Sequence, residues 1–229
     1  MENLKTRLFA DDLFLYLFYQ TKLIKKLPSS HRSAGNEFKE EIGKAVLYFA
    51  HSYHDLHKEF LNSFLEDIMK SKENFIRYLK LYCSGHKCNQ HIFDKFLNVS
   101  SLLYEMVLLC RSQGDNGFIF FAPMCWVEFF EFELRKEFYL KGGWSALRNH
   151  IKLKGYDSKY ENVVPKINHM AITHRESSDE DDQKNIPGDE NASEFKLLSK
   201  KNEQIYSHEK FSSESDPGDS IKRTKHNIF

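Results

Sequence analysis

Residues 137–151 read EFYLKGGWSALRNHI, and this stretch decides the fold. Two adjacent glycines, Gly142 and Gly143, interrupt a segment that otherwise has the composition of a continuous helix. A glycine inside a helix costs about 1 kcal/mol relative to alanine and accepts a positive φ, so the pair predicts a sharp turn between two short helices. Trp144 follows at once and precedes an amphipathic segment. We therefore expect Trp144 to open the second helix and to pack back on the rest of the domain.

The composition argues against several classes of protein. The chain has 33 basic and 33 acidic residues among 229, whereas nucleic-acid-binding proteins normally carry a basic excess. Four cysteines are too few for a disulfide scaffold of this length. Asp11 and Asp12 stand at the start of the N-terminal apolar run, and no small-residue cleavage site follows, so a secretory signal is not indicated. We expect an intracellular protein with no nucleic-acid partner.

The sequence of residues 1–158 predicts one all-helical domain. Pro28 and Pro123 are the only prolines before residue 160, and no segment shows the alternation of apolar and polar residues between turn clusters that is typical of a strand. The spacing of apolar residues, together with charged residues suited to helix ends, predicts a series of helices. Their expected ranges are 11–26, 37–61, 64–70, 72–83, 91–110 and 118–134.

Two of these segments are apolar on nearly every side. Residues 98–110 carry the run SLLYEMVLLC, and residues 118–134 follow after a short turn. A helix that is apolar all round belongs in the centre of a domain. We therefore expect residues 98–110 to form a central buried helix, paired antiparallel with the next one. Glu105 and Glu128 interrupt the two segments, so neither is pure enough to span a membrane.

The rest of the chain, residues 159–229, has a different composition. It contains the polar stretches ESSDEDDQKNIPGDE and FSSESDPGDS and carries more acidic than basic residues. Beyond residue 160 the only aromatic residues are Phe195, Tyr206, Phe211 and Phe229. Such a segment buries too little apolar surface to offset its chain entropy. We expect a disordered, acidic C-terminal tail.

The order of elements resembles the Bcl-2 family of apoptosis regulators. In that family a buried helical hairpin is followed by the Gly-Gly-Trp of the second homology region, which Gly142, Gly143 and Trp144 match. The alternative is a glycine pair that simply ends a helix, followed by a tryptophan by chance. The resemblance implies a Bcl-2-like helical bundle with a central buried helical hairpin.

Two weaker motifs support the resemblance. The segment DDLFLYLFYQTKL, residues 11–23, is similar to the fourth homology region. The segment FAHSYHDLHKEF, residues 49–60, is similar to the third homology region, or death motif, and most resembles the divergent ovary-type branch of the family. The positions that match this death motif are Phe49, Ser52, Asp55, Leu56 and Phe60.

The first homology region is the main departure. The family has Asn-Trp-Gly-Arg there, whereas this chain places Cys88, Asn89, Gln90 and His91 at the four positions. His91 replaces the arginine that pairs with an aspartate of the ligand, and it cannot supply the same bidentate fork. The resemblance implies a hydrophobic groove for partner helices, with weaker binding than in relatives that keep arginine. The implied lining residues are Phe60, Phe64, Phe75, Leu79, His91, Ile92 and Phe96.

By resemblance, the chain regulates apoptosis by binding the amphipathic death-motif helices of Bcl-2 family partners. The recognisable fourth homology region favours a pro-survival role, while a pro-apoptotic role or an unrelated helical adaptor or scaffold stays open. The resemblance also implies a cytoplasmic protein with peripheral association with mitochondrial or endoplasmic reticulum membranes. The final residues, SIKRTKHNIF, are too short and polar for a tail anchor.

Candidate metal and catalytic residues are sparse. Cys83, His86, Cys88 and His91 are zinc-ligand types, but their spacing is too compact for a finger, and an ordinary loop with two thiols is favoured. The three histidines of the second helix are more typical of a solvated helix face than of a metal site; they are His51, His54 and His57. No nucleophile–base pair or phosphate-binding loop is recognisable. We expect no metal, no cofactor and no enzymatic activity.

Overall fold

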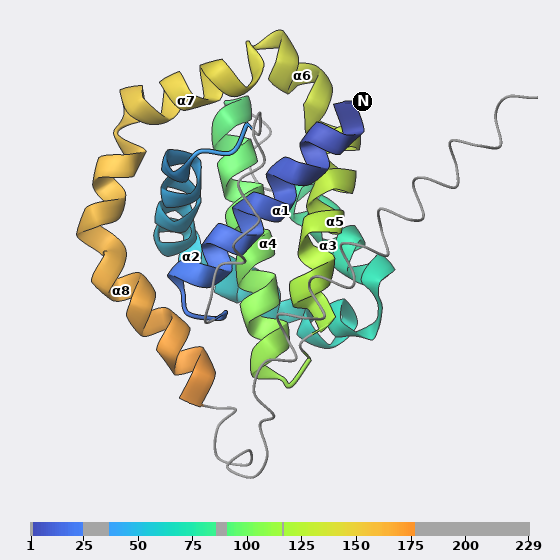
Figure 1. Ribbon diagram of the computed structural model, residues 1–229. Coiled ribbons are helices and arrows are strands. Elements are labelled where there is room, and N and C mark those ends of the chain that lie inside the picture. Colours follow the sequence, from blue (N-terminus) through green and yellow to red (C-terminus); the bar gives the residue numbers. More distant parts are fainter. Residues whose placement is uncertain (1, 25–36, 86–90, 116, 177–229) are drawn as a thin grey trace, which may run out of the picture. The chain divides into compact units, whose positions relative to one another are not determined.

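The computed structural model describes residues 2–24, 37–85, 91–115 and 117–176 (Figure 1). All regular secondary structure within these ranges is helical, and they contain no strand. The all-helical class predicted from the sequence is therefore confirmed. The helices in chain order are α1 (Glu2–Gln20), α2 (Glu40–Lys70), α3 (Lys72–Gly85), α4 (Ile92–Ser112), α5 (Gly117–Phe129), the π-helical segment η1 (Phe130–Leu134), α6 (Arg135–Leu140), α7 (Gly143–Lys154) and α8 (Tyr156–Glu176).

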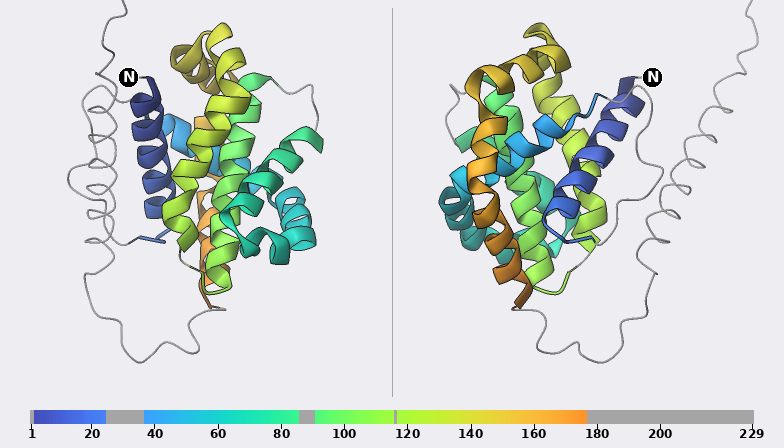
Figure 2. Two further views of the ribbon diagram at one scale, coloured as in Figure 1. Left: turned by 90° about the vertical axis from the view of Figure 1, so that its right-hand side faces the viewer. Right: turned by 60° about the vertical axis from the view of Figure 1, so that its left-hand side comes forward.

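The helices α4 and α5 form an antiparallel hairpin in the middle of the bundle. Figure 2 shows α1 on one side of this hairpin and α3, with the second half of α2, on the other. Nearly every residue of α4 is buried, as its apolar sequence predicts. Within the described ranges, no helix is long and apolar enough to cross a membrane.

The Gly-Gly-Trp turn has the predicted geometry. Gly142 has φ of 100° and Gly143 has φ of 61°, both in the left-handed region that favours glycine. The chain turns between α6 and α7 (Figure 1), and Trp144 becomes the second residue of α7. Its ring centroid lies 4.2 Å from that of Phe9 in α1 and 4.8 Å from that of Phe138 in α6. Trp144 therefore joins α1, α6 and α7 in one aromatic cluster.

The first two helices differ from the prediction. Helix α1 begins at Glu2, well before residue 11, and Asp11 lies inside it, where the carboxylate accepts a hydrogen bond from Arg7 Nε at 3.1 Å. Helix α2 is continuous from Glu40 to Lys70, without the expected break near residue 62. Ser63 fits into the helix because its hydroxyl donates to the Glu59 carbonyl at 2.8 Å. Leu61 on one side of this position and Ile68 on the other are buried, so core packing holds the helix together.

The predicted helix over residues 118–134 changes its winding near its end. Helix α5 passes into the π-helical segment η1 at Phe130. This wider winding turns Phe130 and Leu134 toward the core, while Phe132 between them is 77% exposed. The sequence FFEFEL does not distinguish this geometry from an ordinary helix.

The predicted boundary at residue 158 falls inside helix α8, which continues to Glu176. The side chains of Tyr160 and Ile167 are buried, and Lys44 of α2 donates to Glu161 at 2.6 Å. The expectation that disorder begins at residue 159 is therefore wrong for the residues of α8. Residues 177–229 of the expected tail lie outside the described residues.

The packing of α8 gives a testable stability difference. Replacing Ile167 with alanine should lower the free energy of unfolding by about 2 kcal/mol, because it leaves a cavity at a buried site. Replacing Asn162, an exposed residue of the same helix, with alanine should change the free energy of unfolding by less than about 0.5 kcal/mol. Chemical denaturation of the full chain measures both. Equal, small effects of the two substitutions would mean that α8 does not pack on the bundle in solution.

Candidate functional site

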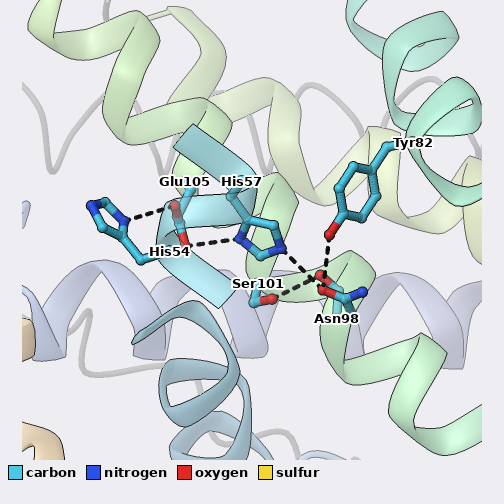
Figure 3. A network of polar contacts seen from close by, with 6 residues as sticks. All are labelled: His54, His57, Tyr82, Asn98, Ser101 and Glu105. Atoms are coloured by element: carbon cyan, nitrogen blue, oxygen red, sulfur yellow. Dashed lines mark hydrogen bonds and ion pairs between the residues drawn. The ribbon is translucent and has the colours of Figure 1, made fainter. Parts of the chain in front are cut away.

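A network of polar side chains joins α2 to the central helix α4 (Figure 3). His54 and His57 come from successive turns of α2, and Glu105 and Asn98 come from α4. Tyr82 of α3 closes the network at the other end. We call these five residues the α2–α4 network.

Glu105 is the centre of this network. Its Oε1 lies 2.9 Å from His57 Nδ1, and its Oε2 lies 3.1 Å from His54 Nδ1. His57 Nε2 faces Asn98 Oδ1 at 3.0 Å, and the Tyr82 hydroxyl donates to the same oxygen at 3.5 Å. His57 and Glu105 are buried, so these hydrogen bonds replace the water that the polar groups lose on folding.

His57 is completely enclosed by the network. Its two ring nitrogens face the Glu105 carboxylate on one side and the Asn98 amide oxygen on the other. The side chain is 0% exposed, so its polar atoms depend on these two contacts. The contacts fix the relative position of the two helices that carry them.

The pKa values of His54 and His51, the two neighbouring histidines, shift in opposite directions. The hydrogen bond to Glu105 raises the pKa of His54 above its ordinary value, although burial and Lys58 oppose the rise. Burial lowers the pKa of His51, and the nearby Lys166 of α8 and His54 lower it further. His51 Nδ1 is buried without a hydrogen-bond partner.

The expectation that His51, His54 and His57 form a solvated helix face is therefore wrong. His57 is buried against α4, and His54 is bonded to the same carboxylate. The sequence contained one signal of this arrangement, which is Glu105 within a helix that is otherwise apolar on every side. A carboxylate there must find a partner, but periodicity cannot say which residue supplies it.

The candidate zinc ligands do not form a metal site within the described ranges. No group of three or more His, Cys, Asp or Glu side chains in these ranges is arranged to hold a metal ion. Burial raises the pKa of the Cys83 thiol to about 12, so this thiol is not a ready metal ligand or nucleophile. His86 and Cys88 lie outside the described residues.

Two of the expected groove residues lie next to each other in the second half of α2. Phe60 and Phe64 are partly buried, with ring centroids 5.2 Å apart. Phe64 stacks on Tyr78 at 4.9 Å, and Phe60 contacts Tyr82 at 5.1 Å. We call this set of four rings from α2 and α3 the aromatic ladder.

The other apolar groove residues belong to the core. Phe75, Leu79, Ile92 and Phe96 are buried. Phe75 stacks on Phe118 of α5 at 4.8 Å. The structure therefore brings Phe60 and Phe64 to one face but leaves the remaining four in the core, with Phe96 in the cluster of Trp126 and Trp144. A partner helix could reach all six only if the bundle rearranged.

His91 stands at the start of α4 and is exposed. Its Nδ1 accepts a hydrogen bond from the Phe93 backbone N–H at 3.3 Å and so caps the helix. Its ring stacks on His150 of α7 at 4.6 Å, and His150 Nε2 lies 2.7 Å from Asp94 Oδ1. His91 thus has a structural role in holding α7 beside the start of α4.

The death-motif-like segment of α2 is packed in place. Phe49 is buried, Leu56 and Phe60 are partly buried, and Ser52 and Asp55 are exposed. The apolar positions that the resemblance singles out therefore face the bundle, and the polar ones face solvent. Comparisons of the chain with models of protein families, with curated proteins and with solved structures find no match.

Proposed function

We propose that this protein is a Bcl-2-like regulator of apoptosis that acts by binding amphipathic death-motif helices of Bcl-2 family partners. The action is non-catalytic and needs no cofactor. The role is pro-survival, and it is exerted from the cytoplasm with peripheral contact with mitochondrial or endoplasmic reticulum membranes.

The observation that carries the proposal is the turn at Gly142 and Gly143. Both residues have positive φ, and the turn places Trp144 against Phe9 and Phe138, so the motif on which the resemblance rests has a defined structural purpose. The buried α4–α5 hairpin that precedes it supports the same proposal.

The aromatic ladder is the docking face in this proposal. Its rings are only partly covered at Phe60 and Phe64, and they lie between two helices, which suits the apolar anchors of an amphipathic helix. The four expected groove residues in the core would become available only if the bundle rearranged. Contact with them therefore includes the cost of that rearrangement, and binding to the isolated domain is expected to be weak.

The test is the affinity of a labelled death-motif peptide, measured by fluorescence anisotropy with the full chain. A peptide with its apolar anchors replaced by glutamate is the matched ligand control. His91→Arg should tighten binding by about tenfold, because it restores a charge-assisted hydrogen bond to the peptide's aspartate. Gln113→Arg adds the same charge at the opposite end of α4 and should leave the affinity unchanged.

The outcomes separate the proposal from its alternatives. Binding of the intact peptide alone supports the groove, and improved binding by His91→Arg supports the alignment of the first homology region. If a folded wild-type protein binds neither peptide, the helical adaptor becomes the better explanation. Expression of the protein in cells under a death stimulus tests whether it promotes or blocks cell death, and the proposal predicts increased survival.

A further inference from the structure

The α2–α4 network holds two helices together and shares one residue, Tyr82, with the aromatic ladder. Helix α2 is long, and His54 and His57 lie near its middle. Their only carboxylate partner in the network, Glu105, lies on the central helix. The same carboxylate therefore receives two imidazole donors from the same face of α2.

We propose that His54, His57 and Glu105 form a proton-controlled clamp, which holds the middle of α2 against α4 while His54 is protonated and loosens as the pH rises. This inference rests on the geometry of the three side chains and does not depend on the role in apoptosis.

The physical basis is the pair of imidazoles that share the Glu105 carboxylate. His57 Nδ1 lies 2.9 Å from Oε1, and His54 Nδ1 lies 3.1 Å from Oε2. Protonated His54 makes a charge-assisted hydrogen bond to this carboxylate, and such bonds are stronger than neutral ones. When His54 releases its proton to solvent it keeps a neutral N–H, but the buried carboxylate loses the adjacent positive charge. The opened arrangement, in which water reaches the carboxylate, is then less unfavourable.

Other charged groups around the clamp set its sensitivity. His54 feels Asp55 and Lys58 on its own helix as well as Glu105 on α4. Helix α8 contributes Lys166, which acts on His51. Helix α3 contributes the Tyr82 hydroxyl, which burial keeps neutral by raising its pKa. Among these groups, Glu105 does most to raise the pKa of His54, through its hydrogen bond.

The sign of the pH effect follows from the histidine pKa values. The pKa of His54 is raised, so its contribution to stability is complete below about pH 6.5 and is lost as the pH rises through the folded-state value. The pKa of His51 is lowered, so its contribution has the opposite sign and is lost as the pH falls below about 6.5. The clamp should therefore be tightest at and below about pH 6.5 and should loosen above it, while His51, whose Nδ1 has no hydrogen-bond partner, affects only the overall stability at lower pH.

Hydrogen exchange of the full chain, followed by mass spectrometry, tests the clamp directly. The readout is the protection factor of peptides covering residues 49–61, corrected for intrinsic exchange rates, at pH 6.5 and 8.5. A single linked proton changes an opening equilibrium by at most about tenfold per pH unit, so protection in the wild type should fall several-fold. Glu105→Gln should show low protection at both pH values. Glu59→Gln, the same change at an exposed position of α2, should behave like the wild type.

A second measurement covers the case in which Glu105→Gln does not fold. Long-range proton–nitrogen NMR spectra of the wild type and of His54→Gln report the protonation of each imidazole nitrogen. The clamp predicts both nitrogens of His54 protonated at pH 6.5, with loss of one proton at higher pH, and the His54→Gln spectrum identifies these signals by their absence. A single neutral tautomer of His54 at pH 6.5, or protection in residues 49–61 that is equal at both pH values, would overturn the proposal.

Discussion

Replacing Trp144 with alanine should lower the free energy of unfolding by about 3–5 kcal/mol, the usual cost of removing a large aromatic side chain from a core. Trp144 lies against Phe9 of α1 and Phe138 of α6, and it also stacks on Phe130 at 5.8 Å. Its removal therefore opens a cavity where three elements meet, and their rigid backbones limit how far the site can collapse. Urea denaturation followed by circular dichroism measures the effect.

The matched control is Leu153→Ala on the same helix. Leu153 is 88% exposed, so its removal should change the free energy of unfolding by less than about 0.5 kcal/mol. A loss below about 1 kcal/mol for Trp144→Ala would contradict its place in the aromatic cluster, and with it the explanation of the glycine pair.

Replacing His57 with leucine should cost about 3 kcal/mol, because it takes the closer of two hydrogen-bond donors from the buried carboxylate of Glu105. The double substitution His57→Leu with Glu105→Leu removes both polar partners and should recover most of this loss, since replacing both partners of a buried hydrogen bond by apolar groups of similar shape is often nearly neutral. Equilibrium denaturation at pH 6.5 of the wild type, the two single variants and the double variant completes the cycle.

The pattern across the four proteins is more informative than any single value. A buried pair predicts strong non-additivity, with the double variant more stable than either single variant. If the two single effects are small and add, then His57 and Glu105 are not paired in solution. Lys58, an exposed residue of the same helix, provides a control, because Lys58→Ala should have little effect on the free energy of unfolding.

Local sequence signals predicted the turn and the central helix correctly for physical reasons. The positive φ of Gly142 and Gly143 follows from a property of glycine itself, and the burial of α4 follows from its own apolar composition. Neither depends on residues far away in the chain. These are the features that a single sequence specifies most directly.

The features that were missed depend on distant partners. The role of His57 needs Glu105, which lies 48 positions away, and no periodicity connects the two. The continuity of α2 depends on the burial of Leu61 and Ile68 against other helices, which outweighs the polar residues between them. Tertiary packing therefore overrode the local pattern in both cases.

Helix α8 was missed although a local signal exists. Tyr156, Tyr160, Val163 and Ile167 recur at the spacing of one helix face, and this face packs on the bundle. The acidic composition of the residues that follow hid this pattern, because the average over residues 159–229 is polar. The groove residues were predicted incorrectly for another reason. Apolar residues at helical spacing occur both in a core and on a docking face, so the spacing could not show that Phe75 and Phe96 lie in the core.

The central claim is that an amphipathic partner helix docks on the aromatic ladder formed by α2 and α3. The most direct measurement is an NMR titration of the isotope-labelled full chain with a death-motif peptide, following the backbone amide signals. The account predicts that the largest shifts fall in residues 56–64 and 75–82, with the exposed face of α7 around Leu153 unchanged. Saturating peptide that produces no shifts, or shifts confined to other parts of the bundle, would contradict it.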